Sequence, residues 1–200
     1  GGNLDDIGKS ISIEQSGNIL ISGHFQGTAD FDPGANVFPL SSVGSYDVFI
    51  LKLDADGNFI WAKKIGGKLD DQCVAITTDS KNDVIVTGNF KDTVDFNPGS
   101  DIYNLKDSGA GNAFALKLNA EGEFIWAKST VGQNIVFSIG MAIDQTGNIF
   151  TTGFFRSEAD FAPGPDILKL TAPGIGGDVF ISKLDSDGNL VWVKQFSGPA

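Results

Sequence analysis

The residues most able to do chemistry in this chain recur inside one repeated motif. The motif Asp-Phe-x-Pro-Gly occurs three times and supplies the side-chain oxygens of Asp30, Asp32, Asp95, Asn97 and Asp160. Several carboxylate and amide oxygens together can bind calcium, and two neighbouring carboxylates can act on a glycosidic bond. The second oxygen ligand, however, is an amide in the second copy and is replaced by Ala162 in the third. We therefore predict at most weak calcium binding, with no site repeated in every copy and no cofactor.

The same motif has a structural interpretation, which we favour. Proline fixes its own φ and biases the preceding residue toward extended backbone, while glycine tolerates positive φ. The aspartate before the phenylalanine can accept hydrogen bonds from turn amides. On this interpretation the motif ends a strand in a defined turn, and its five oxygen-bearing residues are candidate binding residues only as part of a loop surface. Whether any of them binds a metal stays unassigned.

Three further acidic turns pose the same choice between a metal and a hairpin. They read DADGN, NAEGE and DSDGN, and the first resembles the start of a calcium loop. A complete loop needs more oxygen ligands and a distal bidentate acid at fixed spacing, which are missing. A short hairpin with glycine at a left-handed position explains the same letters.

Nothing in the sequence predicts an enzyme, and no catalytic residue is assigned. His24, the only histidine, aligns with Asn89 and Phe154 of the other copies. No serine or cysteine stands in a motif with a nearby base. Cys73, the only cysteine, reads as a buried thiol. The tryptophans lie in strands with apolar neighbours, which favours packing between sheets over stacking on sugars; they are Trp61, Trp126 and Trp192.

Composition excludes several classes of protein. The chain has 200 residues, 41% of them hydrophobic, which is enough for a substantial core. The formal net charge of −11, with 14 scattered Lys and Arg, argues against nucleic-acid binding. No apolar run is long enough for a membrane-spanning helix, which needs roughly 18 residues or more. With one cysteine, no intrachain disulfide can form.

An internal repeat organises nearly the whole chain. Gly23, Gly88 and Gly153 follow one another at intervals of 65 residues, and the Asp, Phe, Pro and Leu of the neighbouring motif keep that interval. The tryptophans show one extra residue in the third copy, which we assign to the loop TAPGIGG. A repeat of this length predicts a modular fold in which each copy packs on its neighbours.

Each copy reads as four short strands separated by turns. In the first copy the segments are KSISIE, GNILISGHFQ, DVFILKL and NFIWAKK, and β-branched and aromatic residues dominate all four. The nearly continuous apolar runs predict sheets covered on both faces. Small residues in the first segment, among them Ser10, Ala75 and Gly140, fit where sheets converge.

We therefore predict an all-β fold of three four-stranded antiparallel β-propeller blades, twelve strands in all, as a partial propeller or a fragment of a larger ring. The expected blades span 1–65, 66–130 and 131–196, and residues 197–200 begin a further repeat. A wedge of three blades leaves two apolar faces open, so further blades of the same chain, or identical chains, are expected to close the ring.

The combined motifs resemble the SBBP repeat, a family named for a seven-bladed β-propeller. The resemblance rests on the openings GGNLDD and GGKLDD, the turns SGNIL and TGNIF, the motif ADFDPG and the closing LDADGNFIWAK. The third copy opens with VGQNIV and lacks the acidic pair, so a shared role for Asp70 and Asp71 does not extend to it. The family implies an envelope or secreted bacterial protein whose propellers serve as interaction modules.

Three functions follow as hypotheses. The first is a non-catalytic interaction or adhesion module of a larger secreted or cell-surface protein, extracellular or else periplasmic, that binds a protein or glycan. The second is an oligomeric lectin, and the third is the scaffold of a propeller enzyme whose active site lies outside this segment. In a meander, the Asp-Phe-x-Pro-Gly connections and the Gly-Gly openings should share one face, with loops 32–46, 97–111 and 162–177 as its interaction surface.

Overall fold

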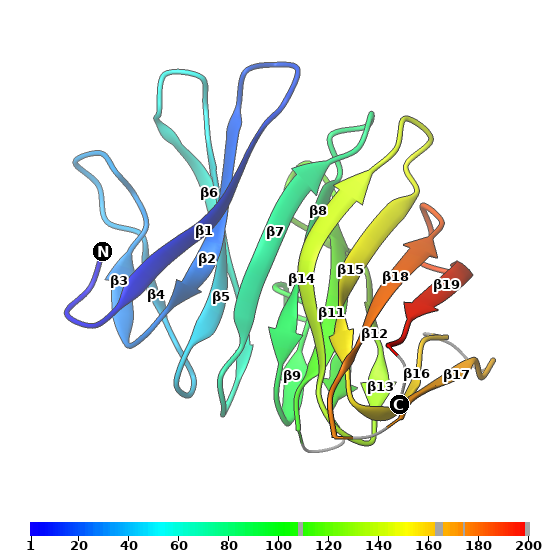
Figure 1. Cartoon of the computed structure of the whole chain (residues 1–200). Helices are drawn as coiled ribbons and strands as arrows, with labels where there is room; N and C mark the ends of the chain where they lie inside the picture. Colours follow the sequence, from blue (N-terminus) through cyan, green and yellow to red (C-terminus); the bar gives the residue numbers. More distant parts are fainter. Residues whose placement is uncertain (108–109, 163–165, 174, 199–200) are drawn as a thin grey trace.

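The computed structural model describes residues 1–107, 110–162, 166–173 and 175–198. These residues form strands and turns only, and twelve of the strands build three four-stranded antiparallel units (Figure 1). The last strand of the first unit also pairs with a short hairpin of the second copy, so that the first unit belongs to a six-stranded sheet. The first unit contains β1 (Asp6–Ile13), β2 (Ile19–Phe25), β5 (Asp47–Leu53) and β6 (Phe59–Gly67). The second contains β7 (Gln72–Thr78), β8 (Val84–Phe90), β11 (Asn112–Leu118) and β12 (Phe124–Ser129). The third contains β14 (Val136–Ile143), β15 (Ile149–Phe155), β18 (Asp178–Leu184) and β19 (Leu190–Phe196). The prediction of an all-β fold with propeller-like blades is confirmed.

The prediction of twelve strands was too low, because the described residues hold nineteen. The connection between the second and third strand of each copy forms a small outer hairpin: β3 (Thr28–Asp30) with β4 (Pro39–Ser41), β9 (Thr93–Asp95) with β10 (Asn104–Lys106), and β16 (Ser157–Asp160) with β17 (Lys169–Ala172). The remaining strand is the short β13 (Val131–Gly132), which pairs with β16. Strands this short carry no alternating pattern in the sequence. They form because hydrogen bonds from the loop amides to the first aspartate of each motif hold the two strands together.

We call each four-stranded sheet with its outer hairpin a blade. The expected boundary between residues 65 and 66 lies inside β6, whose last two residues leave the first sheet and pair with β9 of the second blade. Of the expected further repeat at 197–200, residues 199 and 200 lie outside the described residues.

The three blades stack face to face through their first strands. β7 packs against β1 and β2, and β14 packs against β7 and β8 (Figure 1). The approach between first and second strand is close: a Cβ on Gly23, Gly88 or Gly153 would collide with a backbone carbonyl of the neighbouring strand. This explains why the glycine of the strands ISGHF, VTGNF and TTGFF returns in every copy.

Each blade has two apolar faces, which we name by their central residues. The front face carries Phe49, or its counterparts Phe114 and Phe180, and is partly covered by the blade's own outer hairpin. The back face carries Val48 and its counterparts. The main core lies where the back face of blade 1 meets the front face of blade 2, and we call this interface joint 1–2. Joint 2–3 is the corresponding interface between the back of blade 2 and the front of blade 3.

Candidate interaction surface

The first aspartate of each repeated motif holds the loop of its outer hairpin. Asp30 Oδ1 accepts hydrogen bonds from the backbone N–H groups of Asp32 (3.1 Å) and Phe38 (2.8 Å). These bonds lower the pKa of the Asp30 carboxyl. Asp95 and Asp160 accept the equivalent two bonds at 2.9 to 3.0 Å. The prediction that this aspartate accepts turn amides is therefore confirmed, and ligand binding by it stays a prediction.

The second position of the motif is also engaged in its own loop. Asp32 Oδ1 accepts a hydrogen bond from Gly34 N at 2.7 Å, and Asn97 Oδ1 accepts one from Gly99 N at 2.8 Å. Pro163 and Gly164 of the third motif lie outside the described residues. In the first two loops, each polar side chain of the motif thus uses one oxygen to accept a hydrogen bond from the loop's own backbone. Fewer oxygens are left to bind a cation.

The loops that these aspartates hold carry a row of exposed apolar side chains, one per blade. Val37, Ile102 and Ile167 occupy the same position in successive repeats and are 70%, 74% and 71% exposed. The residue after each of them is apolar as well, and in two blades it is an aromatic ring stacked against the last strand, as in Phe38 on Phe59. Of the expected interaction loops 97–111 and 162–177, residues 108–109, 163–165 and 174 lie outside the described part of the chain.

The blade openings lie beside these hairpins, as predicted for the shared face. The N-terminal amine of Gly1 donates to the carbonyl of Asp30 at 2.8 Å, and Gly2 forms a bridge with Ala29. Gly66 and Gly67 pair with β9 in the same way, and β13 pairs with β16. The outer hairpin is thereby anchored to the incoming chain in every blade.

One acidic pair at joint 1–2 was not recognised from the sequence as a coupled unit. Asp71 is buried and accepts hydrogen bonds from Gly67 N (2.6 Å) and Lys91 N (3.2 Å). Burial raises the pKa of Asp71 to about 7, and the charge of the buried Asp47 adds to the effect. Burial also raises the pKa of Asp47, although bonds from Val43 N and the Lys64 ammonium oppose that shift.

The same place in joint 2–3 carries no carboxylate pair. Asn112 stands at the position of Asp47, where its side-chain oxygen accepts a bond from Gly132 N at 3.1 Å, and Val136 stands at the position of Asp71. The loss of the acidic opening in the third copy was visible in the sequence. Its consequence was not, because Asp47 and Asp71 come from different blades.

The residues considered for catalysis or for stacking on sugars are buried or packed against the core. Cys73 is buried within β7, and its thiol lies 2.9 Å from Ser22 Oγ of blade 1. Burial raises the pKa of this thiol to about 12, which makes it a poor nucleophile. His24 is buried in β2, where its ring meets Tyr46 edge to face and burial lowers its pKa. Trp61 packs against the core of joint 1–2, as predicted.

The acidic hairpin turns are as predicted. Asp54 Oδ1 accepts bonds from Asp56 N and Asn58 N, and Gly57 has φ +85°. Across the described residues, no group of three or more His, Cys, Asp or Glu side chains is arranged to hold a metal ion. In that same part of the chain no helix is long and apolar enough to cross a membrane.

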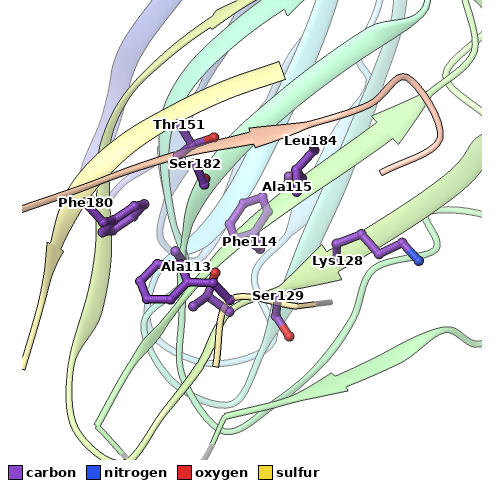
Figure 2. Close-up of a pocket in the computed structure, with 11 residues that line it drawn as sticks. Ala113, Phe114, Ala115, Lys128, Ser129, Thr151, Phe180, Ser182 and Leu184 are labelled. Carbon is purple, nitrogen blue, oxygen red and sulfur yellow. The ribbon is translucent and has the colours of Figure 1, made fainter. Parts of the chain in front are cut away.

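A small cavity lies within joint 2–3. It has a volume of about 30 Å³, and its walls include Ala113 and Ala115 of blade 2 and Thr151, Phe180 and Ser182 of blade 3 (Figure 2). A space of this size holds about one water molecule. It is therefore a packing defect between blades, too small for an organic ligand.

Larger hollows lie on the front of blade 1. One of about 290 Å³ is lined mainly by apolar side chains, among them Ile21, Phe31 and Leu51. Another of about 300 Å³ lies between the outer-hairpin loop and the turn that contains Gly57. On blade 2 the corresponding surface is covered by blade 1.

Comparison with known proteins agrees with this architecture. No protein-family profile matches the chain. The chain is 28% identical over 156 residues to an uncharacterized WD repeat-containing protein of Acanthamoeba polyphaga mimivirus. The aligned region covers 74% of this chain and 11% of that protein. It is 22% identical over 188 residues to the regulatory protein FlaEY of Caulobacter vibrioides. This second aligned region covers 94% of this chain and 19% of that protein. The chain thus spans less than a fifth of either relative. Fold and similarity together indicate a β-propeller-like repeat protein.

Proposed function

We propose that the chain is a non-catalytic interaction module built of propeller blades of the SBBP type, and that it belongs to a larger secreted or cell-surface bacterial protein. Its partner is proposed to be another protein. The similarity to a WD repeat-containing protein supports the choice of a module that binds proteins, although that relative is itself uncharacterized.

One observation carries the proposal, namely the exposed row of Val37, Ile102 and Ile167. Single exposed apolar residues are normal on protein surfaces. Here a β-branched residue stands at the same exposed place in three successive blades, on loops whose backbone is fixed by a buttressing aspartate. Rigid display costs little conformational entropy on binding, and apolar side chains surrounded by polar loops match the core and rim of a protein interface.

The loops around this row differ between blades, which supports selectivity. The first loop reads DPGANVFP, the second NPGSDIYN and the third APGPDILK. A partner that spans several blades would meet the same apolar knobs with different polar neighbours. Loops on a rigid scaffold are where binding residues concentrate.

The test is an interaction screen with two matched variants. The chain is immobilised and cross-linked to proteins of the producing cells and their medium, and captured proteins are quantified by mass spectrometry. One variant combines Val37→Ser, Ile102→Ser and Ile167→Ser. The control combines Asp56→Ser, Glu121→Ser and Asp187→Ser, which also changes one exposed residue per blade, in the turn between the third and fourth long strands.

We expect a partner that the wild type and the turn control retain and that the loop variant loses by about tenfold, which corresponds to about 1.4 kcal/mol. Equal capture by all three chains would contradict the proposal. Binding to a glycan array that survives the loop substitutions would favour a lectin instead.

A further inference from the structure

A hollow of about 130 Å³ lies between blades 2 and 3, beside the end of β8. Its walls are Asp70, Gln72, Asn89, Phe90 and Lys91 of blade 2 and Phe137 of blade 3. Both blades have all four long strands, so the hollow is not part of an end face of the stack. Its volume is close to that of a cavity of about 150 Å³ that binds benzene. A single aromatic ring therefore fits the space.

One end of the hollow carries an ion pair. Lys91 Nζ lies 3.4 Å from Asp70 Oδ2, and the two side chains are 41% and 38% exposed. A hydrogen bond with Ser45 and the charge of Lys91 lower the pKa of the Asp70 carboxyl, although partial burial opposes this shift. The carboxylate is thus ionised near neutral pH and accepts hydrogen bonds. Asp70 would repel a ligand carboxylate and Lys91 a ligand ammonium, so a neutral hydrogen-bond donor suits this end.

The other walls are held in place by contacts between the blades. The Phe137 ring lies against Gly111, where a Cβ would come within 2.7 Å of it. Asn89 Oδ1 accepts from Ser138 N at 2.8 Å, and Asn89 Nδ2 donates to the Ser138 carbonyl at 3.2 Å. The Gln72 side chain, by contrast, is exposed. The hollow thus combines a polar end with a fixed aromatic wall.

Blade 1 shows what the equivalent place holds when it is filled from within the chain. The Tyr46 ring meets His24 edge to face at 5.1 Å between ring centroids, and the Tyr46 hydroxyl donates to Asp5 Oδ2 at 3.1 Å. In the next copy the three equivalent positions are Gly111, Asn89 and Asp70. Blade 2 keeps the aspartate that accepts from the hydroxyl but has no side chain in place of the tyrosine.

We propose that the hollow binds a phenol ring, supplied by a small hydroxylated aromatic compound or by a tyrosine side chain of a protein partner. The hydroxyl donates to the Asp70 carboxylate, as Tyr46 does to Asp5 in blade 1, and the ring packs on Phe137, an arrangement that aromatic pairs favour. The corresponding position of the third copy is Ile135, which has no side-chain oxygen to accept from a hydroxyl.

This site goes beyond the proposed function, because it uses none of the residues in the exposed row. Loss of phenol binding would leave the role of that row unaffected, and loss of partner capture by the row would leave this site unaffected. The two proposals can therefore fail separately.

The test compares p-cresol with toluene, which has the same ring without the hydroxyl. Each is titrated into the isotope-labelled chain, and binding is followed by the NMR shifts of the backbone amides. We expect p-cresol to bind about tenfold more tightly, because its hydroxyl bonds to a charged acceptor. The shifts should concentrate at Gln72, Lys91 and Phe137.

Two variants and a matched control locate the site. Asp70→Ala should abolish the preference for p-cresol over toluene. Gln72→Trp should weaken binding of both probes by filling the hollow, with an unchanged circular dichroism spectrum because Gln72 is exposed. The control Asp5→Ala removes the equivalent aspartate of blade 1, which Tyr46 already engages, and should leave p-cresol binding unchanged.

Equal affinities for p-cresol and toluene, or a preference that survives Asp70→Ala, would overturn the proposal, as would shifts confined to residues outside the hollow. A further pair of probes distinguishes the two sources of the ring. A preference for N-acetyltyrosinamide over N-acetylphenylalaninamide supports a tyrosine of a protein partner. Binding of p-cresol without binding of N-acetyltyrosinamide supports a small phenol.

Discussion

Joints 1–2 and 2–3 join the same kinds of strand in the same register, yet they are filled differently. The back of blade 1 presents Val48 and Ile50, whereas the back of blade 2 presents Ala113 and Ala115. The opposing front of blade 2 presents Val86 and Leu116, whereas blade 3 presents Thr151 and Ser182. The second joint consequently retains a cavity of about 30 Å³.

The comparison indicates that the spacing of blades does not depend on filling every joint with large aliphatic side chains. Both joints contain the same polar contact, in which a lysine and a tryptophan of one blade donate to a single backbone carbonyl of the next: Lys52 with Trp61 in joint 1–2, and Lys117 with Trp126 in joint 2–3. Aliphatic burial then sets how strongly each joint holds, at roughly 25 cal/mol per Å² of apolar surface removed from water. Joint 1–2 should be the stronger of the two.

The largest expected effect is on the core of joint 1–2. Leu116→Ala removes a fully buried side chain, and we expect the free energy of unfolding to fall by about 3 to 4 kcal/mol, because transfer and cavity terms add. The matched control is Ser182→Ala at the same position in joint 2–3, which should change it by less than about 1 kcal/mol. Urea unfolding measures both, and equal losses would show that the joints do not differ as argued.

A smaller effect is expected from the buried lysine of blade 2. Lys117 Nζ pairs with Asp79 at 2.9 Å and Asp83 at 3.2 Å, and the Lys117 and Asp79 side chains are 7% and 6% exposed. Lys117→Met leaves two carboxylates without their cation, and we expect a loss of about 2 to 3 kcal/mol. Lys183→Met should cost much less in this 200-residue chain, because the Lys183 ammonium lies 3.8 Å from Asp144 and the two side chains are 22% and 36% exposed. If the two substitutions lower the free energy of unfolding equally, the burial of Lys117 in joint 2–3 is not the reason why Lys117 stabilises the protein.

The acidic pair makes joint 1–2 sensitive to pH. Burial raises the pKa of Asp71 in the folded state to about 7, above its value of about 4 in the unfolded chain. The contribution of Asp71 to the free energy of unfolding is therefore most favourable below pH of about 4 and is lost as the pH rises to about 7. Asp71→Asn should flatten this dependence by at most about 1.4 kcal/mol per pH unit. Unfolding measured across that range would show it, and an unchanged slope would mean that Asp71 does not titrate there.

The matched position in joint 2–3 should show no such dependence. Asn112 and Val136 replace the two acids there, so neither side chain titrates. Introducing Val136→Asp together with Asn112→Asp should create a new pH dependence of the same sign. This pair of experiments separates the acids of the joint from the other carboxylates of the chain.

The smallest expected effect is a gain. Ala113→Val places in joint 2–3 the residue found at the equivalent positions 48 and 179, next to the cavity. Filling it should raise the free energy of unfolding by up to about 1 kcal/mol. The reverse change, Val48→Ala in joint 1–2, should lower it. A loss on Ala113→Val would show that the cavity walls cannot accept two more methyl groups.

The regularity of the chain made much of its local structure predictable. The four long strands per copy, the glycine hairpins and the aspartate turns follow from residue types within a few positions of one another, and the interval of 65 residues repeats them three times. The outer hairpins were missed because strands such as Thr28–Asp30 are too short to show a pattern. They form through bonds that Asp30 makes eight residues along the chain.

What the sequence determined by itself was the repeat, the all-β class and the turn chemistry, since these depend on backbone preferences of neighbouring residues. What only the tertiary structure decided was how the copies meet. Lys52 reaches a carbonyl 68 residues away, and Asp71 is buried beside an acid of another blade. Such contacts depend on the angle and distance at which rigid sheets stack. That geometry cannot be inferred from the residues that neighbour each contact in the sequence.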